Sequence, residues 1–136
     1  MVRSDSNRAW VRVCALADVP ANKAHDLYIN GQRLIIVRCG DEAQILQGFC
    51  SHMYYPLVGS SVDNESCVIT CSMHQSKFSV QDGSVIDWTV VQHLSGQALE
   101  SVKTNKMLRT YETRLTDGDV YVLWATNNPE SVRIRF

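Results

Sequence analysis

Three short turns, each ending in glycine, constrain the fold of this chain most strongly. They are Asn30-Gly31, Gln81-Asp82-Gly83 and Thr116-Asp117-Gly118, and each lies between two runs of apolar and β-branched residues. Glycine and asparagine adopt the positive φ angles that tight hairpin turns require, so each turn predicts a pair of antiparallel strands. Short strands with turns at this spacing are typical of all-β folds. We therefore expect an antiparallel sandwich or small barrel.

The remaining strands are predicted from short apolar runs bounded by turn residues. Besides the three hairpins, strands are expected at residues 9–16, 43–49 and 66–70. One segment, residues 89–106, departs from this pattern because its apolar residues recur every four positions, as on one face of a helix. Gly96 weakens a helix, so this segment forms either a short helical excursion or a surface loop with a helical turn. Its length also fits a partner-docking role.

Length and charge limit the functions that this chain can have. With 136 residues, of which 45% are hydrophobic, it fits one domain, predicted over residues 9–125 between a flexible N-terminus (1–8) and a C-terminal tail (126–136). The formal charge of −1 lacks the basic excess typical of proteins that bind nucleic acid or anionic membranes. No apolar stretch approaches the ~18 residues of a membrane span, and the N-terminus carries no apolar signal-peptide core. We therefore expect a cytoplasmic protein whose partners are proteins.

Two cysteine–histidine pairs are the strongest candidates for a functional site. They are Cys50-x-His52 and Cys71-x2-His74, and each directly follows a predicted strand. Loops at one end of a sheet commonly carry sites on a rigid scaffold, which would let the four side chains converge. Thiolate and imidazole ligands suit zinc or iron–sulfur chemistry. Structural zinc sites usually use Cys-Cys and His-His pairs, whereas a mixed pair in each loop fits a two-iron cluster with both cysteines on one iron and both histidines on the other.

The two pairs, with eighteen residues between them, resemble the ligand motif of Rieske-type iron–sulfur proteins. Leu57, Phe78 and Gly83 also occupy positions at which that family has an apolar residue, an aromatic residue and a glycine. The likeness to the small Rieske ferredoxins extends over roughly residues 9–125. It implies a Rieske-like all-β fold, a two-loop cluster-binding subdomain at about residues 48–83, and one 2Fe-2S cluster. The implied ligands of the cluster irons are Cys50, His52, Cys71 and His74.

The chain also departs from the family pattern at several loop positions. Ser51 and Ser72 stand where the family commonly has proline after each cysteine, and Gln75 replaces a frequent glycine. High-potential relatives have an additional cysteine in each loop, and these two form a disulfide. The corresponding residues here are Tyr55 and Met73, so the loops lack that disulfide.

Cysteines outside the two pairs are interpreted as structural. The chain has five cysteines, an odd number, and shows no export signal, which favours reduced thiols over a disulfide framework. Cys14, Cys39 and Cys67 are therefore expected to be small buried hydrophobic residues.

Three residues, Leu57, Ser76 and Phe78, are expected to lie next to the cluster. Ser76 is interpreted either as a hydrogen-bond donor to a bridging sulfide, as in high-potential relatives, or as an ordinary polar loop residue. Phe78 stands where those relatives have a tyrosine, and we expect it to pack in the core beneath the loop. Without the tyrosine hydroxyl and the loop disulfide, the reduction potential should lie toward the low end of the Rieske range, roughly −150 mV.

The remaining histidines argue against a complete oxygenase. Rieske oxygenases also hold a mononuclear iron with two histidines and a carboxylate, and only His25 and His93 are left for such a site, both expected to be solvated. The resemblance therefore implies a non-enzymatic one-electron carrier between a reductase and an oxygenase or other terminal redox enzyme, and we expect it to be a monomer. Two alternatives stay open: an accessory small subunit of a larger redox enzyme, of the nitrite reductase type, and a zinc-stabilised binding module.

Overall fold

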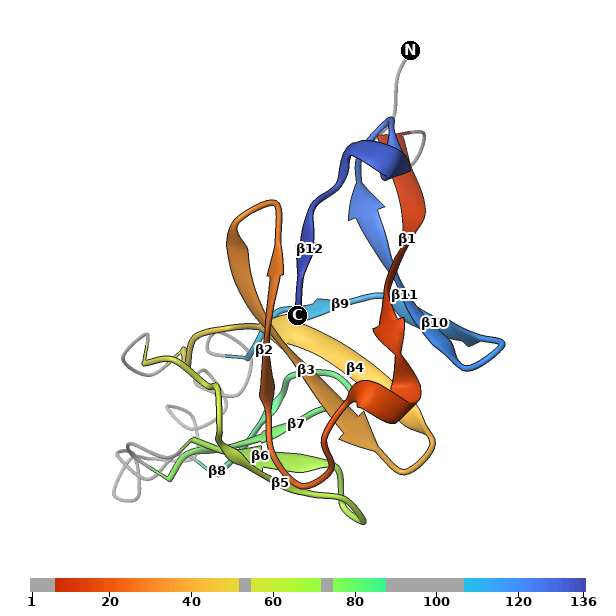
Figure 1. The fold of residues 1–136 in the computed structure, drawn as a ribbon. Coiled ribbons are helices and arrows are strands. Elements are labelled where there is room, and N and C mark those ends of the chain that lie inside the picture. Colours follow the sequence, from red (N-terminus) through yellow and green to blue (C-terminus); the bar gives the residue numbers. More distant parts are fainter. Residues whose placement is uncertain (1–6, 52–54, 72–74, 88–106) are drawn as a thin grey trace.

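The computed structural model describes residues 7–51, 55–71, 75–87 and 107–136, and the regular elements of these segments are strands and two short 3-10 turns (Figure 1). The all-β class is confirmed, and residues 89–106, expected as an excursion, lie outside the described residues. The elements are β1 (Arg8–Ala15), η2 (Leu16–Asp18), β2 (His25–Ile29), β3 (Gln32–Cys39), β4 (Glu42–Gln47), β5 (Ser61–Asp63), β6 (Val68–Thr70), β7 (Lys77–Ser79), β8 (Val85–Asp87), β9 (Thr110–Tyr111), β10 (Thr113–Thr116), β11 (Asp119–Ala125), η4 (Pro129–Ser131) and β12 (Ile134–Arg135).

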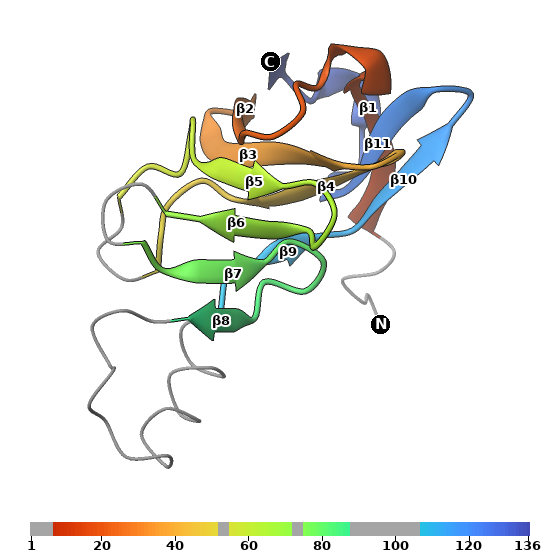
Figure 2. The same cartoon turned by 90° about the horizontal axis from the view of Figure 1, so that it is seen from below.

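The strands form three antiparallel sheets. A central sheet has the order β12-β2-β3-β4-β9, a second has the order β1-β11-β10, and the third has the order β5-β6-β7-β8. Figure 2 shows the four strands of the third sheet side by side. This last sheet comes from residues 61–87, within the range expected for the cluster-binding subdomain.

The central sheet is buried on both faces, as the alternation of side chains along β3 shows. Leu34 and Ile36 pack with β1 and β11 in one hydrophobic cluster. Ile35 and Val37 pack on the other face, in a cluster with residues of β5 to β8. Successive strand residues point to opposite faces, so the continuous apolar run of β3 fits a strand covered on both sides.

The three glycine turns are confirmed as hairpins. Asn30 and Gly31 join β2 to β3 with φ angles of 51° and 81°, and Asp117 and Gly118 join β10 to β11 with φ angles of 52° and 81°. Gly83, between β7 and β8, has a φ of 78°. All these angles lie in the left-handed region, which glycine and asparagine adopt at low cost.

A disulfide corrects the expectation that the cysteines outside the pairs are all reduced. Cys39, at the end of β3, is bonded to Cys67, in the turn before β6, with 5.7 Å between their Cα atoms. The bond ties the central sheet to the third sheet at the ends of their strands. The two residues are 28 positions apart, and only the packing of the sheets brings them together. Cys14 remains a buried thiol, as expected.

The segment expected as a C-terminal tail forms part of the central sheet. Ile134 and Arg135 of β12 pair with Ile29 and Tyr28 of β2. At the other end of β2, His25 begins the strand rather than lying in a loop, and the centroids of its ring and of the Phe136 ring are 4.4 Å apart.

None of the helices in the described segments is long and apolar enough to span a membrane.

Candidate metal centre

The two cysteines of the predicted ligand pairs begin two loops that are closed in the same way. The backbone N–H of Cys50 donates a hydrogen bond of 2.7 Å to the carbonyl of Tyr55, and the N–H of Cys71 donates one of 2.8 Å to the carbonyl of Ser76. In each case the bond joins the cysteine to the residue five positions later. The two histidines, His52 and His74, fall within these loops and lie outside the described residues.

Both loops emerge from the same side of the packed sheets. Cys50 follows β4 and Cys71 follows β6, and Figure 2 shows that the chain leaves both strands on one side of the molecule. The two cysteines are fully buried, share one hydrophobic cluster and are not disulfide-bonded. Leu57 and Phe78, expected beside the cluster, are fully buried in the same hydrophobic cluster. The structure therefore places both buried thiols at the same end of the sheets.

Ser76 supplies an observation that tests whether a sulfur-containing group fits here. Its Oγ atom is buried, and no other part of the described chain offers it a hydrogen-bond partner. A buried hydroxyl without a partner is costly, so such groups usually mark a ligand, ion or water. Ser76 also closes the second loop, because its carbonyl accepts from the N–H of Cys71. Two buried thiols and a buried hydroxyl that has no partner among the described residues fit an iron–sulfur cluster, whose sulfides accept hydrogen bonds.

Gly48 positions the first loop, although it was not among the predicted site residues. A Cβ atom on Gly48 would lie 2.7 Å from the carbonyl oxygen of Arg33, so only glycine allows β3 to pass this closely. Leu57 then donates its N–H to the Gly48 carbonyl at 2.9 Å, which holds both ends of the loop together. A glycine inside the predicted strand at residues 43–49 was the signal in the sequence.

A second missed contact links the first loop to β9. The Gln47 N–H donates to the Arg109 carbonyl at 2.9 Å, and the Arg109 N–H donates to Gln47 Oε1 at 2.7 Å. Gln47 Nε2 also donates to the carbonyl of Phe49 at 2.7 Å, one residue before Cys50. These bonds fix the strand end that carries the first cysteine.

Gly83, at the family position identified in the sequence, lies in the turn between β7 and β8 and contacts Leu108. A Cβ atom on this glycine would overlap the carbonyl oxygen of Leu108, and its φ of 78° is also unfavourable for other residues. Leu108 donates its N–H to the Gly83 carbonyl at 2.7 Å. The described chain therefore returns, after residues 88–106, directly onto the hairpin that follows the second loop.

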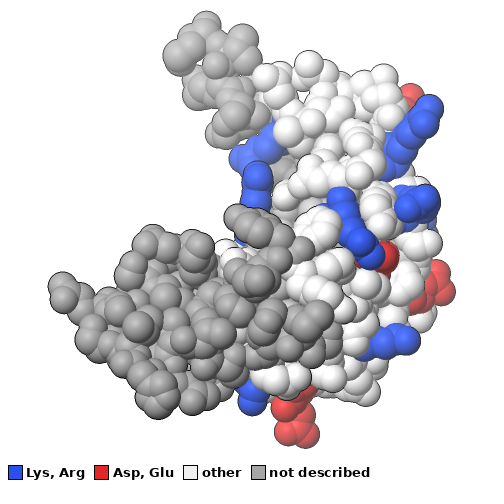
Figure 3. All heavy atoms as spheres, turned by 90° about the vertical axis from the view of Figure 1, so that its left-hand side faces the viewer, with Lys and Arg blue, Asp and Glu red and all other residues white. Residues whose placement is uncertain are grey.

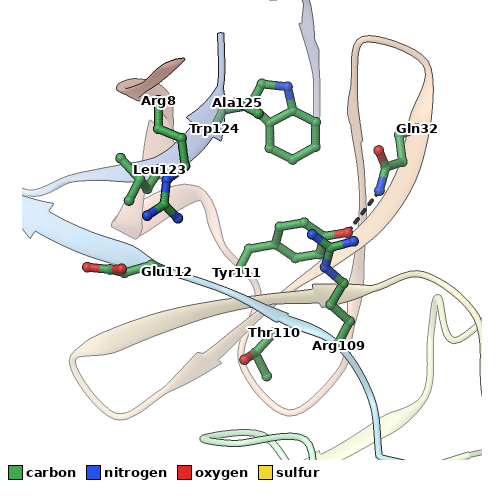
Figure 4. Close-up of a pocket in the computed structure, with 9 residues that line it drawn as sticks. All are labelled: Arg8, Gln32, Arg109, Thr110, Tyr111, Glu112, Leu123, Trp124 and Ala125. Carbon is green, nitrogen blue, oxygen red and sulfur yellow. Dashed lines mark hydrogen bonds between the residues drawn. The ribbon is translucent and has the colours of Figure 1, made fainter. Parts of the chain in front are cut away.

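A separate cavity of about 350 Å³ opens between β9 and β11. Figure 4 shows Tyr111 and Trp124 on its walls and Gln32 donating a hydrogen bond of 2.9 Å to the Tyr111 hydroxyl. Its lining contains no cysteine or histidine, so it is not the site of the cluster. The lining residues are Arg8, Gln32, Arg109, Thr110, Tyr111, Glu112, Leu123, Trp124 and Ala125.

Comparison with known proteins decides the family. Residues 9–112 match the Rieske [2Fe-2S] domain family. The chain belongs to the Rieske [2Fe-2S] domain family. The match covers both ligand loops and the strands from β1 to β9, and the family implies one Rieske-type 2Fe-2S cluster.

Solved Rieske proteins share the fold at low sequence identity. The ferredoxin of carbazole 1,9a-dioxygenase from Nocardioides aromaticivorans IC177 has a TM-score of 0.67 at 22% identity, covering 84% of this chain and 96% of that chain. A putative NADH-dependent nitrite reductase small subunit from Mycobacterium tuberculosis has a TM-score of 0.62 at 16% identity, covering 86% and 96%. A chain in the complex of reduced oxygenase and oxidized ferredoxin in carbazole 1,9a-dioxygenase has a TM-score of 0.61 at 22% identity, covering 82% and 99%. The TM-scores show that the chain has the fold of Rieske ferredoxins, and at these identities the likeness extends to the fold alone.

Proposed function

We propose that this Rieske protein is a one-electron carrier whose 2Fe-2S cluster is bound by Cys50, His52, Cys71 and His74. The observation that carries the proposal is the pair of equivalent loops, each beginning with a fully buried, disulfide-free cysteine and each containing a histidine. When bound, the cluster supplies reversible one-electron chemistry. In the Rieske arrangement the two thiolates would bind one iron and the two imidazoles the other.

The residues around the two thiols prepare the site for such a group. Leu57 and Phe78 exclude water from the cysteine side of the site, because both are fully buried with Cys50 and Cys71. Ser76 offers its hydroxyl as a donor to a sulfide, which would stabilise the additional negative charge after reduction. Two thiolates rather than four also keep the site less negative, which raises its potential relative to an all-cysteine cluster.

A carrier role, without catalysis of its own, is supported by the small number of histidines. If His52 and His74 bind the cluster, only His25 and His93 remain, and His25 lies in β2 against Phe136. A mononuclear iron site of the oxygenase type needs two histidines and a carboxylate together. We therefore expect the chain to pass electrons from a reductase to an oxygenase or other terminal enzyme.

Metal and sulfide analysis tests the proposal directly. The purified protein should contain about two irons and two acid-labile sulfides per chain. Cys50→Ser should abolish both, whereas Cys14→Ser should keep both, because Cys14 lies in the other hydrophobic cluster, with β1 and β11. One zinc per chain without sulfide would contradict the proposal and support a zinc-stabilised module instead.

A second function, an accessory subunit of a larger redox enzyme, is favoured by the shared fold with a nitrite reductase small subunit. The two roles differ in assembly. A carrier should elute as a monomer when purified from its source cells, whereas an accessory subunit should co-purify with a large subunit in constant ratio.

A further inference from the structure

The disulfide between Cys39 and Cys67 lies beside a cavity of about 430 Å³. Both cysteines line this cavity, together with residues of β4 and of the turns that follow β3, precede β6 and follow β7. Cys39 is half-buried, whereas Cys67 is 7% exposed. A molecule that enters the cavity therefore meets the disulfide, and Cys39 is the more accessible of its two cysteines.

This cavity lies away from the ligand loops. In Figures 1 and 2 the hairpin that joins β3 to β4 and the turn that joins β5 to β6 lie on the right of the molecule. Figure 3 faces the opposite side, on which the chain leaves β4 and β6. The residues that line the cavity include neither Cys50 nor Cys71. A reagent in the cavity therefore approaches the disulfide from the end of the sheets opposite to these two cysteines.

Hydrogen bonds hold the two turns together independently of the disulfide. The Gly40 N–H donates to Asn64 Oδ1 at 2.7 Å, which joins the β3–β4 turn to the β5–β6 turn. The Cys67 N–H donates to the Asp63 carbonyl at 2.8 Å, and the Cys67 carbonyl accepts from the N–H of Val80 at 2.9 Å. These bonds involve no sulfur atom, so reduction of the disulfide leaves their donors and acceptors unchanged.

Hydrophobic packing also keeps the two cysteines close to each other. Cys67 belongs to the hydrophobic cluster that contains the fully buried side chains of Val37 and Ile69, and Cys39 packs against the same cluster. Burial of these side chains stabilises the contact between the two sheets whether or not the sulfurs are bonded. Two thiols that stay adjacent have a high effective concentration relative to each other, so the bond between them re-forms readily.

We propose that the Cys39–Cys67 pair is a second redox site, at which a small dithiol exchanges electrons with the folded protein independently of the cluster. A thiolate of the dithiol attacks Sγ of Cys39 and breaks the disulfide, so Cys67 leaves as a thiolate and takes up a proton. The second thiol of the reagent then attacks the mixed disulfide, forms a cyclic disulfide and releases Cys39 as a thiol. Two electrons and two protons pass from the dithiol to the protein.

Reduction kinetics under native conditions test whether the bond is open to direct attack. The protein is incubated with dithiothreitol, quenched with iodoacetamide and cleaved after Glu42 and Glu65, which separates Cys39 from Cys67. Tandem mass spectrometry then locates the labelled cysteines. The rate of labelling should rise in proportion to the dithiothreitol concentration, because the reagent attacks the folded protein.

A variant with a weaker fold separates direct attack from reaction through unfolding. Val120→Ala, in the other hydrophobic cluster, should lower the stability of the whole fold but leave the rate of reduction unchanged. The wild type in urea below its unfolding transition provides the same comparison without a substitution. A rate that increases by the same factor as the unfolding equilibrium constant would overturn the proposal, because the bond would then react only in unfolded chains.

A monothiol tests whether the two thiols stay adjacent after the bond is broken. 2-Mercaptoethanol at the same thiol concentration should leave the disulfide largely intact, because the Cys67 thiolate attacks the mixed disulfide at Cys39 and expels the reagent. Complete reduction by this monothiol would show that the two thiols separate, which contradicts a reversible site.

The hydrogen bond between Asn64 and Gly40 provides the most specific variant. Asn64→Ala should shift the equilibrium in mixtures of reduced and oxidised dithiothreitol toward the reduced protein by about fivefold, the effect of one hydrogen bond. Asn128→Ala is the matched control, because Asn128 Oδ1 also accepts from a backbone N–H, that of Glu130, but lies outside the cavity lining. No shift in Asn64→Ala, or an equal shift in both variants, would contradict the role of the two turns.

A complete redox cycle tests reversibility and independence from the cluster. The urea midpoint should fall when dithiothreitol reduces the protein, because the unfolded chain loses a cross-link, and should return when oxidised dithiothreitol accepts the two electrons. The visible spectrum of the cluster should stay constant through the cycle. A midpoint that does not recover, or bleaching in step with the labelling of Cys39 and Cys67, would overturn an independent and reversible redox site.

Discussion

The two ends of the sheet formed by β5 to β8 are held together differently, although one short strand, β6, connects them. At one end Cys67 is joined to Cys39 by a disulfide, and side chains cap the turns: Asp63 Oδ1 accepts from the N–H groups of Glu65 and Ser66, and Asn64 Oδ1 accepts from that of Gly40. At the other end Cys71 begins a loop closed by two backbone bonds, from the Cys71 N–H to the Ser76 carbonyl and from the Gln75 N–H to the Cys71 carbonyl, and Ser76 Oγ has no partner among the described residues.

This difference indicates that one end stabilises the fold and the other end binds the functional group. The disulfide end satisfies its polar groups from within the chain, so it needs no ligand to hold its turns. The ligand end keeps two thiols and a hydroxyl available, which costs stability until a group that uses them is bound.

The largest effect is expected when each of the two cysteines beside β6 is replaced by serine in turn. Cys71→Ser should abolish cluster assembly completely, because a serine cannot supply the thiolate. Cys67→Ser removes a cysteine four positions earlier and should keep the visible spectrum of the cluster. Spectra recorded after identical reconstitution compare the two variants, and an intact cluster in Cys71→Ser would rule out the assignment.

Removal of the disulfide tests the stabilising role of the other end. The double variant Cys39→Ser, Cys67→Ser should lower the free energy of unfolding by about 3–4 kcal/mol, the loop-closure value for a separation of this size. The reduction potential of the cluster should stay unchanged. Urea unfolding and voltammetry of the same samples provide the two readings, and a loss of the cluster under native conditions would show that the two ends are not independent.

Ser76→Ala sharpens the comparison at the ligand end. Loss of a hydrogen bond to a sulfide should lower the potential by about 60 mV, equivalent to about 1.4 kcal/mol for one electron. Ser60→Ala is a matched control. The Ser60 Oγ atom is also buried without a partner among the described residues, but Ser60 follows the first loop and its backbone is bonded to Ala24. A shift of equal size in both variants would argue against a specific bond from Ser76.

The smallest expected effect concerns a turn cap at the disulfide end. Backbone N–H groups of Ser66 and Glu65 lower the pKa of Asp63, so its carboxylate stabilises the fold above the unfolded pKa and loses this contribution as the pH falls through the folded pKa. Asp63→Asn should therefore lower the thermal midpoint slightly at pH 6 to 7, and the difference from the wild type should disappear near pH 3. Asp41→Asn in the adjacent turn serves as the control, and a difference that persists unchanged at pH 3 would contradict an effect of charge.

Local sequence patterns were enough to predict the hairpins and the family. The φ angles of Asn30-Gly31 and Asp117-Gly118 follow from residue type alone, because few residues adopt the left-handed region. The two Cys-His pairs identified the Rieske motif because their spacing is specific. The burial of Phe78 in the core was also predicted correctly.

Contacts between sheets could not be predicted in the same way. The bond between Cys39 and Cys67 depends on how two sheets pack, which no local pattern encodes. The odd number of cysteines pointed to reduced thiols, and that inference was wrong for this pair. The close approach of Gly48 to Arg33 and the addition of β12 to the central sheet are likewise long-range features.

The most direct test of the central claim is pulsed electron paramagnetic resonance on the reduced protein, grown once with natural histidine and once with ¹⁵N-labelled histidine. A cluster bound by His52 and His74 predicts modulation from two directly coordinated imidazole nitrogens, which changes from the ¹⁴N to the ¹⁵N pattern with the label. A reduced cluster whose spectrum shows no histidine nitrogen coupling would contradict Rieske ligation by the two loops.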